Sequence, residues 1–109
     1  MPFEEVRYMW LIVFFDLPVK TKKERRAANT FRNFLKKDGY DMLQLSVYAR
    51  ICRGREAVDT RLRRLDANLP PAGFIRAMQV TDKQYARMHV LLGESTTQES
   101  IATEQLLLF

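Results

Sequence analysis

The chain of 109 residues has room for one domain, and its shares of 47% hydrophobic and 28% charged residues exclude a disordered segment. A net charge of +5 and a pI of about 9.7 favour a polyanionic partner, either nucleic acid or an acidic membrane surface, although a globular protein without such a partner can have the same balance. The single cysteine, Cys52, excludes an intrachain disulfide and a cysteine-rich zinc site.

The first predicted element is a strand at Met9–Phe15, where seven apolar residues follow one another without a polar break. A strand with one wet face alternates between apolar and polar residues, so this strand should be buried on both faces. Asp16 follows it directly, and Pro18 stops it. An acid at the carboxyl end of a buried strand is a common place for chemistry, but the same carboxylate could instead accept hydrogen bonds from loop amides.

Two features of the amino-terminal part predict where the protein works. Glu4 and Glu5 stand where a signal peptide has basic residues, and the apolar run is too short to span a bilayer. We therefore expect an intracellular, cytoplasmic protein with no membrane partner.

A helix is predicted for Lys22–Asp38. It opens on a capping-box pattern, in which the Thr21 hydroxyl accepts from the amide of Glu24 and the Glu24 carboxylate accepts from the amide of Thr21. One apolar stripe recurs at three- and four-residue spacing, formed by Ala27, Phe31, Phe34 and Leu35. Gly39 stands where a left-handed cap would end the helix.

The rest of the chain alternates between strand and helix patterns. Residues 40–52 are too long for one short strand, so we expect an antiparallel pair that turns near Gln44–Ser46. Apolar spacing predicts a second helix at Arg55–Asn68, which the turn at Pro70–Gly73 ends. Three further elements are predicted: a strand at Phe74–Val80, a short helical turn that Thr81 and Asp82 cap and that runs to Met88, and a brief final strand at His89–Leu92.

This order of elements predicts an α+β fold with the ferredoxin-like βαββαβ arrangement and an extra C-terminal strand. Both helices would cover one face of a four-stranded antiparallel sheet, in a domain at residues 1–93. The other face also needs cover, and a homodimer packed through the sheet is the simplest one. Residues 94–109 are predicted to be a flexible tail whose apolar end, residues 106–109, either packs on its own domain or docks on a partner.

Basic residues crowd the segment from 20 to 37, which holds eight of the 18 in the chain and is opposed only by Glu24 and Asp38. A salt-bridged solvent face alternates in sign, so this run favours binding to a phosphate backbone, with a merely solvated helix face as the alternative. The basic residues of this run are Lys20, Lys22, Lys23, Arg25, Arg26, Arg32, Lys36 and Lys37. A second, weaker cluster is diluted by Glu56, Asp59 and Asp66 and consists of Arg53, Arg55, Arg61, Arg63 and Arg64.

Asp16 is the candidate for metal chemistry. Mg²⁺ prefers carboxylate oxygens and lowers the pKa of a bound water, which can then attack a phosphodiester. One carboxylate per chain makes a poor magnesium site, whereas two copies of Asp16 across a dimer axis would make a better one. His89, the only histidine, has no neighbouring metal-binding or catalytic motif and suits a surface or packed position, and Ser46 lacks a nucleophile elbow.

Three segments of the chain carry a family resemblance. They are the apolar run ending in Phe14-Phe15-Asp16-Leu17-Pro18, the basic Thr21-Lys22-Lys23-Glu24-Arg25-Arg26, and Gly39-Tyr40 leading to Leu43-Gln44-Leu45-Ser46-Val47-Tyr48. In this order and spacing they resemble the second CRISPR-associated protein family, the small adaptation subunit, and within it the members of type II systems. The resemblance covers about residues 9–92.

The resemblance implies a ferredoxin-like homodimer that bridges two dimers of the CRISPR integrase, in a heterohexamer that inserts a short captured duplex as a new spacer. It also implies Mg²⁺-dependent endonuclease activity on single-stranded RNA or duplex DNA, with Asp16 as the metal ligand. The Gly, Gln, Ser and Val pattern of the family maps onto Gly39, Gln44, Ser46 and Val47. Many members have a basic residue just before this Gln, where Met42 and Leu43 stand here.

Several functions are compatible with these observations. The first is a scaffold that binds duplex DNA through Lys20, Lys22, Lys23, Arg25 and Arg26 and presents it to the integrase. The alternative is a stand-alone metal-dependent endoribonuclease that uses paired Asp16. An RNA-recognition module of the same topology ranks lower because residues 46–50 lack its stacking aromatic pattern, and a small-molecule sensor would not need so basic a helix.

Overall fold

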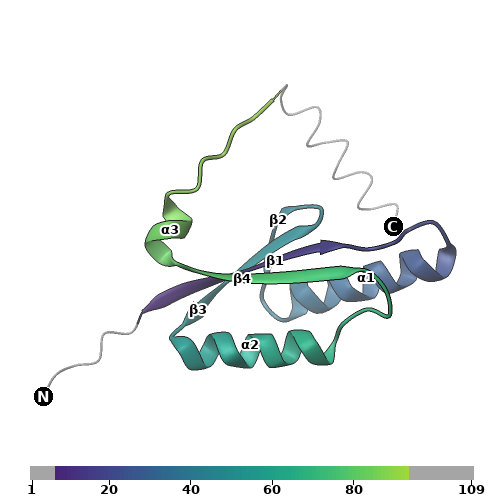
Figure 1. The fold of residues 1–109 in the computed structure, drawn as a ribbon, viewed down its shortest axis with the longest axis horizontal. Coiled ribbons are helices and arrows are strands. Elements are labelled where there is room, and N and C mark those ends of the chain that lie inside the picture. Colours follow the sequence, from purple (N-terminus) through teal and green to yellow (C-terminus); the bar gives the residue numbers. More distant parts are fainter. Residues whose placement is uncertain (1–6, 94–109) are drawn as a thin grey trace, which may run out of the picture.

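The computed structural model describes residues 7–93, in which a four-stranded antiparallel sheet carries helices on its faces (Figure 1). β1 (Tyr8–Asp16) lies inside the sheet, between β3 (Val47–Arg53) and β4 (Phe74–Thr81). β2 (Asp41–Gln44) pairs with β3 at the far edge. The spatial order β2-β3-β1-β4, with a helix after β1 and another after β3, is the ferredoxin-like βαββαβ fold. The predicted α+β fold class is confirmed.

Two antiparallel ladders hold β1, and their register decides which residues share a face. Ile12 lies opposite Ala49 of β3 and Met78 of β4. Because side chains alternate along a strand, Leu11, Val13 and Phe15 point to one face of the sheet. The residues that point to the other face are Trp10, Ile12, Phe14 and Asp16.

The helices divide the two faces unequally. α1 (Lys22–Lys37) and α2 (Arg55–Ala67) lie on one side of the sheet, and the short α3 (Asp82–Ala86) lies on the opposite side (Figure 1). The side of α1 and α2 holds the main core, which consists of Leu11, Val13, Phe15, Phe31, Leu35, Tyr40, Tyr48, Cys52, Val58 and Leu65. Among residues 7–93 no helix is both long and apolar enough to cross a bilayer.

Local sequence signals define the ends of α1. Thr21 and Glu24 form both hydrogen bonds of the capping box, at 3.0 and 2.8 Å. At the other end, the amides of Gly39 and Tyr40 donate to the carbonyls of Lys36 and Leu35, at 3.1 and 3.0 Å. This is a Schellman cap, and Gly39 supplies the positive φ of 93° that it requires.

The other predicted elements are found with small shifts in their ends. β2 and β3 turn at residues 45–46, as expected, and α2 ends at Ala67, one residue before the predicted Asn68. A second capping box, between Thr81 and Gln84, starts α3, which ends at Ala86 and not at Met88.

The prediction of an extra strand at His89–Leu92 is wrong for this structure. Residues 88–93 have no regular secondary structure, and within residues 7–93 the sheet has four strands. The apolar pattern of this segment was the reason to expect a strand, but a strand also needs a neighbouring backbone to pair with. The side chains of Val90, Leu91 and Leu92 are exposed. The predicted tail at 94–109 lies outside the described residues.

Candidate nucleic-acid interface and open sheet face

The start of α1 gathers basic side chains around a structured turn. Lys20, Lys22, Lys23 and Arg26 are exposed, and none of them pairs with an acid in the described part of the chain. The one acid among them, Glu24, is held by the helix cap through the amide of Thr21. Positive side chains at a helix N-terminus interact unfavourably with the helix dipole. These residues therefore do not stabilise α1, and their position suits the binding of an anion.

Arg25 has a different role from its neighbours in this cluster. Its Nη1 donates to the carbonyls of Val19 and Lys20, at 3.2 and 3.1 Å, and its side chain is half-buried. Arg25 therefore shapes the loop that presents Lys20, and a nucleic acid would meet only part of its guanidinium.

Arg32 departs from the expectation of a surface basic run. It is 8% exposed, its Nε donates to the carbonyl of Leu45 at 3.4 Å, and its guanidinium carbon lies 5.6 Å from the centroid of the Phe15 ring. Burial lowers the pKa of Arg32. Arg32 thus braces the β2–β3 turn against α1, because its position on the helix faces the core rather than the solvent.

Asp16 lies at the carboxyl end of β1, on the face opposite to α1 and α2, and is exposed. It borders a hollow of about 260 Å³ whose wall is formed by Phe14, Phe15, Ser46, Val47, Phe74 and Arg76. No residue in the range 7–93 forms a hydrogen bond or ion pair with its carboxylate. The alternative expectation, that Asp16 accepts from loop amides, is therefore not supported.

The structure brings Asp16 together with part of the motif taken from the family resemblance. Ser46 and Val47 line the same hollow, and the Ser46 carbonyl accepts from the amide of Phe15 at 3.0 Å. Gly39 lies elsewhere, at the end of α1. Sequence reasoning missed Arg76, which comes to the hollow only because the β1–β4 register sets it opposite Phe14.

A magnesium ion does not fit the groups of one chain at this position. Among the residues described, no three His, Cys, Asp or Glu side chains are grouped so that they could hold a metal ion. Asp16 is a single carboxylate in the hollow, and Arg76 nearby adds positive charge. A metal site here would need further oxygen ligands from a second molecule.

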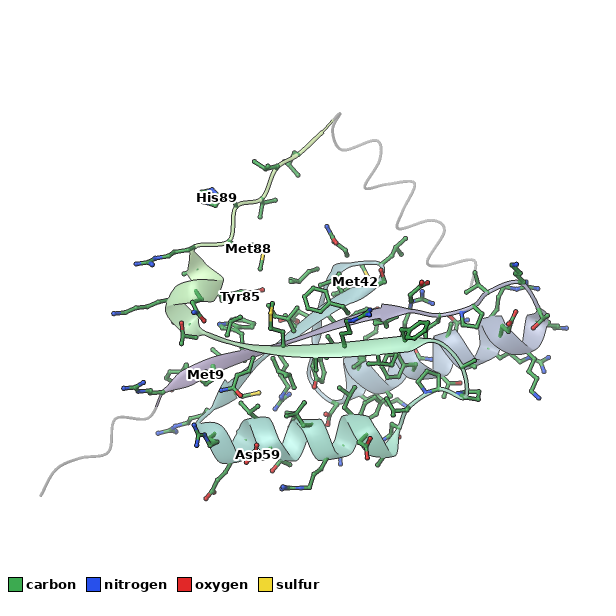
Figure 2. The ribbon with its side chains drawn as sticks, in the orientation of Figure 1. Met9, Met42, Asp59, Tyr85, Met88 and His89 are labelled. Atoms are coloured by element: carbon green, nitrogen blue, oxygen red, sulfur yellow. The ribbon has the colours of Figure 1, made fainter. Side chains whose placement is uncertain are left out.

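The sheet face opposite to α1 and α2, here called the open face, is apolar and only partly covered. Figure 2 shows Tyr85, Met88 and His89 on this side of the sheet. Tyr85 stacks on Trp10, with ring centroids 3.8 Å apart, and the indole Nε1 donates to Asp82 at 2.8 Å. These contacts fix α3 over one end of the face. His89 is exposed, and no group of three metal-binding side chains includes it among the residues described.

Between α3 and the middle of the sheet, the open face contains a hollow of about 730 Å³. Its floor includes Ile12 and Phe14, and Met78 at its edge is 48% exposed. Gln44 and Val47 line the same hollow from the β2–β3 hairpin. An apolar surface of this kind in a basic protein indicates an interface.

A buried ionic cluster at the end of α1 was missed by sequence reasoning. Asp38, at the C-cap of α1, is 3% exposed in its side chain and accepts from Arg61 Nη1 at 2.6 Å and Arg64 Nε at 2.7 Å. Arg50 Nη1 donates to the Asp38 carbonyl at 2.6 Å. Burial, together with the Asp38 charge, raises the pKa of the neighbouring Tyr40 to about 12. Nothing in the local sequence links Asp38 to residues more than 20 positions away.

A second structural constraint, besides the helix cap, requires a glycine at position 39. A Cβ at this position would collide with Nη1 of Arg50, the same nitrogen that donates to Asp38. A glycine is therefore required both by the left-handed backbone and by the guanidinium that crosses it.

Comparisons with known proteins agree on one family. The family model described as CRISPR associated protein Cas2 matches residues 9–88, from β1 to just beyond α3. The CRISPR-associated endoribonuclease Cas2 of Acidovorax ebreus is 49% identical over 102 residues, which cover 93% of this chain and 100% of that protein. Proteins of the same name from Paracidovorax avenae and Flavobacterium psychrophilum are 46% and 41% identical, and the matches cover 94% and 96% of this chain and 95% and 91% of the relatives.

We expect Gly39→Ala to destabilise the fold, and to cost less when Arg50 is already alanine. Gly39 has a positive φ of 93°, so alanine meets a backbone penalty of about 1–2 kcal/mol in either background. Only in the presence of Arg50 would the new Cβ also collide with a guanidinium. Urea unfolding of the single and double variants measures the difference, and equal losses in the two backgrounds would show that the Arg50 contact contributes nothing.

Proposed function

Because the chain belongs to the Cas2 family of CRISPR-associated proteins, we propose that it acts in spacer acquisition, as a homodimer that binds duplex DNA and bridges two dimers of the CRISPR integrase. The observation that carries this proposal is the basic start of α1. Its exposed Lys20, Lys22, Lys23 and Arg26 have no acidic partner among residues 7–93.

The chemistry of the α1 cluster favours binding without sequence selection. Lysine and arginine side chains that meet phosphates release condensed counterions, and this gain is the same for every base sequence. A subunit that holds spacers of any sequence needs contacts of this kind, since base-edge contacts would restrict which duplexes it accepts.

The open face supports the homodimer. Phe14 and Met78 would leave water if the same face of a second copy packed on it, as in the two-fold symmetric dimers that are commonest among oligomers. Met88 and the residues up to Leu91 line the same hollow and would join this interface. The dimer remains a proposal that rests on this apolar surface.

A second candidate function is cleavage of RNA, because the relatives at 41–49% identity carry the name endoribonuclease. Asp16 supports it as an exposed carboxylate without an ionic partner among the residues described. The cofactor we propose is Mg²⁺ between the two Asp16 side chains of a dimer, where bound metal would make a water more acidic. Each chain would supply one Asp16 carboxylate, which borders the hollow.

Replacing Lys22, Lys23 and Arg26 by alanine should weaken binding to duplexes of unrelated sequence by a similar factor. Each lost phosphate contact lowers the slope of log Kd against log salt concentration by about 0.9, so the slope should fall by about 2 to 3. Fluorescence anisotropy at several salt concentrations measures both quantities. The matched control removes three exposed basic residues elsewhere, Arg53, Lys83 and Arg87, and an equal loss there would show that net charge alone matters.

Met78→Glu should convert a dimer into a monomer. It adds a carboxylate to the middle of the open face, where two copies would bury it without a partner. Gln79→Glu is the control, because the next residue on β4 points to the other face of the sheet. Analytical ultracentrifugation gives the masses. A wild type that is monomeric at all concentrations, or a Met78→Glu variant that stays dimeric, would contradict a dimer through this face.

Asp16→Asn should abolish cleavage of single-stranded RNA in the presence of Mg²⁺ and leave spacer integration by the matching integrase unchanged, since holding a duplex does not require this carboxylate. Asp41→Asn, another exposed acid at the sheet, is the control for the change in charge. RNA cleavage at the wild-type rate would exclude the nuclease role of Asp16. Failure of integration with the dimer and DNA affinity intact would place Asp16 in adaptation itself.

A further inference from the structure

The ionic cluster around Asp38 holds more positive charge than its single carboxylate neutralises. Arg61 and Arg64 donate to the carboxylate and Arg50 donates to the backbone carbonyl of Asp38, so the local charge is positive by about two. This positive charge exceeds what is needed to neutralise one buried carboxylate. The cluster therefore presents positive charge to the solvent as well as joining α1 to α2.

Arg64 is the part of the cluster that can reach a ligand. Its side chain is 53% exposed, and only its Nε is engaged by Asp38, at 2.7 Å. Neither of its Nη atoms has a hydrogen-bond partner among residues 7–93. Arg61 is less exposed, at 22%, and uses Nη1 for Asp38. A guanidinium held through Nε keeps two parallel Nη donors, which is the geometry that matches two oxygens of a phosphate.

Asp38 is itself rigidly placed. Its backbone carbonyl accepts from Arg50, its amide donates to the carbonyl of Phe34, and it is the C-cap residue of α1. A surface arginine normally loses side-chain freedom when it binds a phosphate. Arg64 has already lost part of that freedom through its bond to Asp38, so less remains to be lost on binding.

We propose that Asp38 is a positioning residue that holds Arg64, with Arg61 beside it, as a second site for a phosphate of the duplex backbone. This inference rests on the duplex binding proposed above. The 16 residues of α1 span about 24 Å at about 1.5 Å per residue, so this site and the basic start of α1 lie too far apart to share one phosphate. A duplex that lies along α1, at about 3.4 Å per base pair, would have about seven base pairs between the two sites.

The rival explanation is that the cluster only ties two helices together. The two explanations predict opposite signs for one substitution. Asp38→Asn removes a negative charge, so electrostatics by net charge alone would strengthen duplex binding. If Asp38 positions Arg64, the same change weakens binding in spite of the added positive charge.

The test measures duplex binding of the full chain by fluorescence anisotropy over a range of salt concentrations. Asp38→Asn should weaken binding by roughly two- to tenfold, the effect of losing a typical hydrogen bond, and lower the salt slope by about 0.9. The control is Asp59→Asn on the exposed side of α2 (Figure 2), with the same change in charge. It should bind as tightly as wild type or more tightly.

A second pair of variants keeps the test decisive if Asp38→Asn unfolds. Arg64→Lys preserves the charge but loses the paired Nη donors, and it should weaken binding by a similar factor. Arg63→Lys, its exposed neighbour on α2, should not. Equal affinities for these two lysine variants, or tighter binding by a folded Asp38→Asn, would overturn the proposal.

The variant with alanine at Lys22, Lys23 and Arg26 separates this inference from the function on which it rests. If that variant loses affinity while the Asp38 and Arg64 variants bind like wild type, only the second site is refuted. If wild type binds no duplex at any salt concentration, both the proposed function and the second site fail.

Discussion

The pairing of β1 on both of its edges is the constraint on which the rest of the structure depends. Antiparallel ladders to β3 and β4 satisfy its backbone, and its side chains alternate between two faces that are both apolar. The helices α1 and α2 can cover only one of these faces. The open face, the hollow beside α3 and the position of Asp16 at the end of β1 all follow from this arrangement.

The acids of the α1 region explain how a moderate net charge gives concentrated positive surfaces. Glu24 is held in the helix cap, and Asp38 is buried under two arginines. Neither carboxylate pairs with the exposed basic side chains at the start of α1. Positive charge is therefore exposed near both ends of α1, through the lysines and Arg26 at its start and through Arg64 of α2, which Asp38 holds, at its end.

Much of the fold was predictable because its signals are local. The capping boxes, Gly39 at the Schellman cap and the turn near Ser46 each depend on a few neighbouring residues. The interior position of β1 was predictable for a different reason, since an unbroken apolar run is typical of a strand in the middle of a sheet. The strand expected at His89–Leu92 failed because a strand depends on a partner backbone, which the pattern of one segment does not specify.

By itself, the sequence determined the order of the elements, the burial of β1, and the basic and acidic residues around the start of α1, because each depends on spacing within one segment. Only the tertiary structure decided which charges are free. It buried Arg32 against Phe15 and made Arg25 a hydrogen-bond donor to the loop before α1. It brought Arg76 to the hollow that Asp16 borders. It also joined Asp38 to Arg61 and Arg64, which follow it by 23 and 26 positions in the sequence. Such pairs form between side chains that approach each other only after the helices pack on the sheet, so no local pattern encodes them.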